Sequence, residues 1–267
     1  MKFVILIALD TVRSIRRHRV MLAFVLLALA GTGLVTTGIA RSARHIEQTE
    51  ALKPHAAEDT PAAGAADATQ IKVHEMEQFF NAAFAWAMSF FGSLLSLIVF
   101  CTVVYSEVHT GTIRVTLAKP VPRWSYLLGK WMGATVIVAG YCVVAGAAAA
   151  VIGVAYGAQG IWTLTFVPWL TFCGSIVVGA VGLVYSLFVR PPVAGVLAWF
   201  TSATWVTGFK PLYAVLPSYQ PFDVFEMMTL GTPLGAWSMV ITTLYAIDLV
   251  AILLLVAFVR FRRMEIA

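Results

Sequence analysis

Residues 79–105 read FFNAAFAWAMSFFGSLLSLIVFCTVVY and contain no charged side chain. A helix needs about 20 mostly apolar residues to cross the hydrocarbon core of a bilayer, so this stretch predicts a membrane span. The composition of the chain agrees, because 60% of its 267 residues are hydrophobic and only 12% are charged. A soluble domain has roughly 25% charged residues. The sequence therefore predicts an all-α, polytopic membrane protein.

Five other apolar stretches are also long enough to cross a bilayer. We predict a single transmembrane domain over residues 1–267, with six spans at 20–40, 79–105, 131–156, 164–189, 193–216 and 236–259. The fifth is interrupted by Lys210 and Pro211. The first half of residues 208–236 contains three prolines together with bulky apolar side chains. Irregular backbone is tolerated at membrane depth when it packs on protein, so we expect residues 208–236 to form a re-entrant segment.

The distribution of lysine and arginine predicts the orientation of these spans. If both termini lie on one side, that side carries 13 of the cationic residues and the other side carries 5. Cytoplasmic loops carry the excess of Lys and Arg, so both termini are expected in the cytoplasm. The same bias explains the net charge of +5 without a nucleic-acid partner.

Two segments outside the spans have a predicted role. Residues 1–19 predict an amphipathic helix in the membrane interface, with its cations near anionic headgroups. Its apolar face holds Ile5, Ala8, Leu9, Val12 and Ile15. Residues 41–78 are expected to form the one long external loop, because residues 58–70, EDTPAAGAADATQ, have a composition typical of flexible chain.

Small residues are concentrated in the predicted third span. Gly140, Gly146 and Gly153 lie in an alanine-rich run. Small side chains let helix backbones approach closely inside a membrane. We therefore expect these glycines to pack against other helices of the bundle.

The loop between the second and third spans, residues 106–130, is short and basic. Glu107 lies just after the second span, and Gly111 and Thr112 can end one helix and cap the next. Residues 113–119 are then expected to form a short helix on the membrane surface, which Pro120 ends.

The second half of this loop combines cations with aromatic residues. Trp124 and Tyr126 suit the membrane interface, and Gly129 and Lys130 are expected to lead into the third span. Two interpretations stay open for the cations Arg114, Lys119 and Arg123. They contact an acidic groove of a partner, or they only fix the orientation of the spans in the membrane. Three interpretations stay open for Glu107. It receives motion from a partner, caps the surface helix, or only ends the second span.

The loop resembles the cytoplasmic-loop signature of ABC-2 type transporter permeases, the membrane subunits of one class of bacterial ATP-binding-cassette exporters. The family pattern is an acid after the second span, a Gly-Thr pair, a short apolar helix, a proline, an arginine and a Gly-Lys pair. These positions are held here by Glu107, Gly111, Thr112, Pro120, Arg123, Gly129 and Lys130. Arg114 lies within the short helix. The six-span layout is also similar to the family.

The resemblance implies a type V ABC exporter-like fold in the bacterial cytoplasmic (inner) membrane. It further implies that residues 106–130 are a coupling loop seated on a cytoplasmic ATPase, present in two copies and binding ATP-Mg. A second permease copy or a homologue would complete the transporter, and substrate would be exported. The chain is not expected to be an enzyme or to bind a cofactor. The chain lacks the phosphate-binding motif of ATPases, G-x-x-x-x-G-K-[ST], because the Gly-Lys pair at Lys130 is followed by Trp131.

Catalytic and metal-binding residues are not predicted, since the sequence has no HExxH or GxSxG motif and its histidines have no ligand spacing. Asp248 is a candidate intramembrane polar site. A charge deep in a span is costly, so we expect Asp248 to face protein or water. Its role is either contact with a proton or cation or the locking of helices.

An alternative function is a membrane anchor or assembly factor, for example in copper-centre maturation, that binds a cytoplasmic partner without transport.

Overall fold

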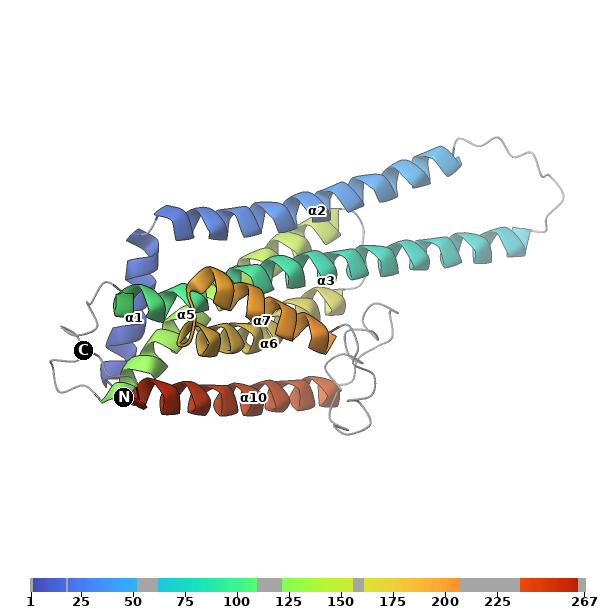
Figure 1. Ribbon diagram of the computed structural model, residues 1–267. Helices are drawn as coiled ribbons and strands as arrows, with labels where there is room; N and C mark the ends of the chain where they lie inside the picture. Colours follow the sequence, from blue (N-terminus) through green and yellow to red (C-terminus); the bar gives the residue numbers. More distant parts are fainter. Residues whose placement is uncertain are drawn as a thin grey trace.

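The fold is a bundle of α-helices (Figure 1). The structure is a computed structural model that describes residues 2–17, 19–51, 62–109, 122–155, 161–206 and 236–263. The described residues form α1 (Lys2–Arg17), α2 (Arg19–Ala51), α3 (Ala62–His109), α5 (Arg123–Ala155), α6 (Ile161–Ser186), α7 (Pro191–Val206) and α10 (Ala236–Arg263). No strand occurs within these ranges. The predicted all-α class therefore agrees with the structure.

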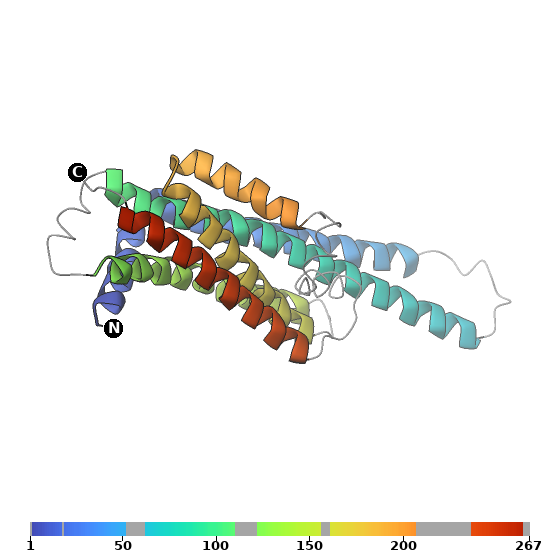
Figure 2. The same ribbon diagram turned by 60° about the horizontal axis from the view of Figure 1, so that its bottom comes forward.

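α3 and α6 lie at the centre of the bundle. α3 contacts α2, α5, α6 and α7, and α6 also contacts α5, α7 and α10. α1 lies across one end of the bundle against α5, whereas α2 and α3 extend beyond the opposite end (Figures 1 and 2). The start of α1 and the end of α10 lie on the same side of the bundle as the end of α3 and the start of α5 (Figure 1). We call it the terminal end.

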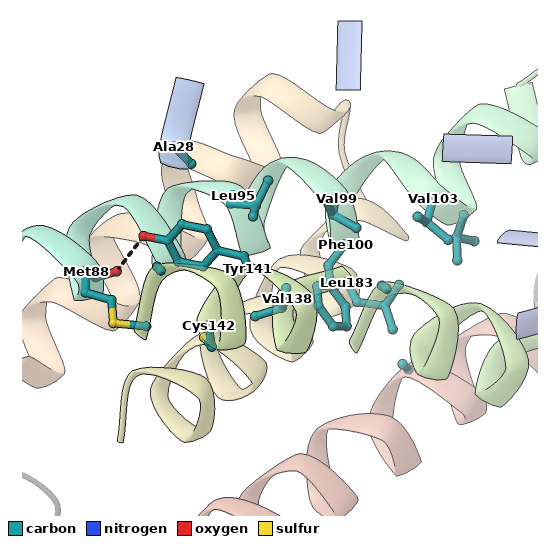
Figure 3. Packing of buried hydrophobic residues seen from close by; sticks show 14 of the residues in the cluster. Ala28, Met88, Leu95, Val99, Phe100, Val103, Val138, Tyr141, Cys142 and Leu183 are labelled. Atoms are coloured by element: carbon teal, nitrogen blue, oxygen red, sulfur yellow. Dashed lines mark hydrogen bonds between the residues drawn. The ribbon is translucent and has the colours of Figure 1, made fainter. Parts of the chain in front are cut away.

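The core is formed mainly by α3 and α5 (Figure 3). Leu95, Val99 and Phe100 of α3 pack with Val138 and Tyr141 of α5. The Tyr141 hydroxyl also donates to the carbonyl of Met88 at 3.3 Å, and lies 2.8 Å from the hydroxyl of Thr32 on α2. A buried hydroxyl without a partner would be costly, so these bonds favour one packing of the three helices.

Small residues allow α3 and α6 to pack closely. A Cβ placed on Gly179 of α6 would lie 2.5 Å from the Ser96 hydroxyl and from the Phe100 ring of α3. The Ser96 hydroxyl donates to the carbonyl of Ser175 at 2.5 Å. The absence of a side chain at Gly179 is thus what lets this hydrogen bond and the Phe100 contact form together.

The glycines of the predicted third span have different surroundings. A Cβ on Gly146 would lie 2.6 Å from Cγ of Pro168 in α6, so its predicted packing role is confirmed. The prediction is wrong for Gly140 within this chain, because no atom of another helix lies within 4 Å of that position. The surroundings of Gly153 are outside the described side chains.

Four helices in the described ranges are long and apolar enough to cross a membrane, namely Phe84–Glu107, Arg123–Ile152, Phe166–Ser186 and Met239–Arg263. They correspond to the second, third, fourth and sixth predicted spans. The first and fifth are represented by shorter apolar helices, Leu22–Val35 and Pro191–Thr201. The chain is therefore a multi-pass membrane protein, and the count of six spans stays a prediction. The predicted re-entrant segment lies outside the described residues except for Ala236, which starts α10.

The prediction of an external loop over residues 41–78 needs correction. α2 continues to Ala51 and α3 begins at Ala62, so most of that segment is helical. The prediction gave too much weight to polarity and too little to residue type. Ala, Glu, Gln and Lys are good helix formers, and they extend the apolar helices on both sides. Residues 52–61 lie outside the described part.

Gly179→Ala is expected to destabilise the protein by about 1–3 kcal/mol, because the new methyl group overpacks the contact with Ser96 and Phe100. Thermal unfolding of the purified protein in detergent measures the effect. Gly174→Ala is the matched control on the same helix, since a Cβ there would meet no other atom within 4 Å. Equal unfolding temperatures for the two variants would contradict the close packing of α3 and α6.

Candidate functional site at the ends of the basic loop

The two ends of the basic loop are joined by a buried ion pair. Glu107 lies near the end of α3, and Lys130 lies in the second turn of α5. The Lys130 ammonium group donates to Oε1 of Glu107. The Tyr126 hydroxyl donates to the other carboxylate oxygen, Oε2, at 2.6 Å. Tyr126 and Lys130 are four positions apart on a helix, so they present the same face to Glu107.

This cluster is shielded from solvent on most sides. Lys130 is 3% exposed and Tyr126 is fully buried, while the Glu107 side chain is 22% exposed. The Lys130 ammonium lies 5.8 Å from the centre of the Tyr126 ring, within the range of a cation–π interaction. A buried charge is strongly destabilising when its partner is removed, so the three side chains depend on one another.

α10 is tied to the same cluster. The Phe261 ring stacks on the Tyr126 ring, with centres 5.8 Å apart and planes 10° apart. The Arg123 guanidinium donates to the carbonyl of Arg262 at 3.1 Å. The last carbonyls of a helix lack partners within the helix, and a cation there is favourable. The end of α10 is therefore bound to the start of α5 by a ring stack and a cap.

α1 packs on a neighbouring face of α5 through two glycines. A Cβ on Gly129 would lie 2.7 Å from Cβ of Ile7, and one on Gly133 would lie 2.6 Å from Cβ of Thr11. The two glycines are four positions apart and so form one shallow channel along α5. Any larger side chain in this channel would push α1 away.

The apolar face predicted for the N-terminal helix is only partly open. Ile5 and Leu9 are more than half exposed, as are Phe3 and Leu6 beside them, so this side is free to contact lipid. Ala8 belongs instead to the side that packs on α5, because its carbonyl lies 2.9 Å from the position of a Cβ on Gly133. The interfacial position of α1 stays a prediction.

The boundaries of the predicted coupling loop need correction. Residues 106–109 belong to α3, and α5 begins at Arg123, so residues 123–130 are helical. The carbonyl of Pro122 starts this helix by accepting from the backbone of Ser125 and Tyr126 at 2.9 and 3.2 Å. Gly129 and Lys130 are therefore packing and ion-pair residues inside α5, not residues that lead into it.

The other predicted loop residues divide into two groups. Arg123 is exposed at the start of α5. Gly111, Thr112, Arg114 and Pro120 lie outside the described residues, together with the predicted surface helix over residues 113–119. Their coupling role stays a prediction.

Tyr126 and Gly133 have roles that the sequence pattern alone does not predict. Tyr126 was expected at the membrane interface, yet it is fully buried between Glu107 and Phe261, whereas Trp124 is 50% exposed as expected. The signal that could have identified both residues is their spacing. Tyr126 precedes Lys130, and Gly133 follows Gly129, by one helical repeat.

Asp248 does not belong to this cluster. It lies on α10 about three helical turns before Arg260. Its side chain is exposed on the single chain, and its expected role as an intramembrane polar site stays a prediction. The described ranges contain no group of three His, Cys, Asp or Glu side chains suited to a metal ion.

These features define a multi-pass helical membrane protein in which one buried ion pair joins the ends of a short basic loop. The family model described as ABC-2 family transporter protein matches residues 4–266, so the chain belongs to this family. It is thus a membrane component of a transporter, and the family is generally not catalytic itself. A comparison with curated proteins gave no match.

Lys130→Met is expected to lower the free energy of unfolding by about 3–5 kcal/mol, because Glu107 would be left as an unpaired, largely buried charge. Glu107→Gln should also destabilise the protein, and the double variant should lose much less than the sum of the single losses. Thermal unfolding in detergent measures all three. Additive losses would show that the ion pair makes no contribution of its own.

Gly133→Val is expected to displace α1 from α5, because the new side chain would overlap Thr11. The measurement is the rate of thiol labelling of a cysteine introduced by Thr11→Cys, in a chain whose three native cysteines are replaced by alanine. Thr11 is 1% exposed, so labelling should be slow while α1 stays packed on α5. Labelling should become at least several-fold faster. Gly140→Val is the control, since it has free space around it, and equal rates for both variants would refute the packing channel.

Proposed function

We propose that this protein is the permease subunit of an ABC-2 type transporter, which couples ATP hydrolysis by a separate ATPase to export of a substrate. Two ATPase copies bind ATP-Mg in the cytoplasm, and a second permease copy or a homologue completes the complex. The permease has six spans in a type V-like arrangement in a bacterial inner membrane, with both termini cytoplasmic. Family membership and the positive-inside bias support this assignment.

The observation that carries the proposal is the buried ion pair between Glu107 and Lys130. The basic loop connects the end of α3 to the start of α5, and the ion pair joins these two helices next to the loop. A force applied to the loop therefore acts on α3 and α5 together. A flexible attachment would instead absorb the movement within the loop.

The neighbouring contacts extend this unit to two more helices. Tyr126 connects it to α10 through Phe261, and Gly129 connects it to α1 through Ile7. Tightly packed elements move as blocks more readily than they deform. An ATPase that closes on ATP and displaces the loop would thereby move the terminal ends of α1, α3, α5 and α10 as one block. This is the step that links hydrolysis to the membrane domain.

The experiment is purification of the tagged chain from its native membrane in mild detergent, followed by identification of its partners and by ATPase assays. A soluble partner with a P-loop is expected. Glu107→Gln should leave the chain in the membrane but reduce ATP turnover in the complex at least several-fold, or release the ATPase. Arg263→Ala, which removes an exposed cation at the same end, is the control.

Two results would contradict the proposal. If the intact chain purifies with a soluble partner that lacks a P-loop, it acts as a membrane anchor or assembly factor. If Glu107→Gln keeps both the ATPase and its full turnover, the ion pair has no part in coupling.

A further inference from the structure

A groove of about 500 Å³ lies at the terminal end of the bundle, and its lining does not include Glu107, Tyr126 or Lys130. It is formed where the last turns of α3 meet the turn between α6 and α7. Val104, Leu187, Phe188 and Val193 provide apolar walls, and Arg190 provides a cation. Phe188 is 56% exposed and Val193 is 51% exposed, so these walls are open on the single chain.

A second cation lies beside the groove. The Arg260 guanidinium, from α10, lies 4.8 Å from the centre of the Phe188 ring. Arg190 and Arg260 are both exposed, and the lining of the groove contains no carboxylate. In the part of the chain that the structure describes, the ion pair joins Lys130 to Glu107 and involves neither Arg190 nor Arg260. The charges of the two arginines are therefore not neutralised by a described carboxylate. The groove therefore combines apolar walls with two guanidinium groups at its edge.

The depth of the groove suits the boundary between hydrocarbon and headgroups. Ser186 ends one helix that is long enough to span a membrane, and Arg260 lies in the last turn of another. Clusters of arginine at this depth attract the anionic lipids of the cytoplasmic leaflet. Guanidinium groups bind phosphate through paired, charge-assisted hydrogen bonds.

We propose that this groove is a binding site for an anionic phospholipid. The phosphate lies between Arg190 and Arg260, and the first part of an acyl chain lies on Phe188 and Val193. A lipid fits better than an acidic protein surface, because it places apolar chain and negative charge next to each other at this depth. The lining of the groove includes none of the residues of the Glu107 cluster.

Native mass spectrometry of the full chain in detergent, titrated with dioleoyl-phosphatidylglycerol, tests the site. One cation near an anionic surface changes affinity about fivefold, so R190A/R260A should weaken binding of the first lipid about 25-fold. Arg263→Ala is the matched control and should change binding less than twofold. Val193→Trp should weaken binding by filling the groove while both arginines remain.

Three outcomes would overturn the proposal. R190A/R260A could bind phosphatidylglycerol as the unchanged protein does. Dioleoyl-phosphatidylcholine, which has no net charge, could bind equally well. The double variant could instead lose a soluble protein partner while its lipid binding is unchanged, which would make the groove a protein-docking surface.

Discussion

The ion pair between Glu107 and Lys130 determines how the terminal end of this protein is built. Two charges removed from water require close pairing and further hydrogen bonds, and Tyr126 supplies one to the second oxygen of Glu107. Because Tyr126 is held in place by this bond, its ring can support Phe261 of α10. The helix ends that the basic loop connects are thereby held together. The proposed coupling function depends on that connection.

Glycine has a different role on the neighbouring face of α5. Gly129 and Gly133 let α1 lie directly on the helix that carries Tyr126 and Lys130. α1 is thus packed against the bundle on one face and keeps Phe3, Ile5, Leu6 and Leu9 exposed on the other. In the proposed function, a helix with these two faces would connect the membrane surface to the Glu107 cluster.

The sequence was sufficient to predict the helical membrane class and the family, because charge-free runs and the residues of the loop motif are local features. The motif residues Glu107, Gly129 and Lys130 were predicted as functional, but the contacts they make were not. Pairing across α3 and α5 depends on how the helices meet in space, which hydrophobic runs do not specify. The extension of α2 and α3 through residues 41–51 and 62–78 was missed because helix propensity continues where hydropathy ends.

The central claim is that the basic loop contacts an ATPase on the terminal side of the membrane. A photo-crosslinking amino acid at Arg114 tests it directly in native membranes, with Arg41, a cation assigned to the opposite side, as the control position. The account predicts a covalent adduct from position 114 with a soluble protein that carries a P-loop, and none from position 41. An ATPase that co-purifies with the chain but never crosslinks to position 114 would contradict the account.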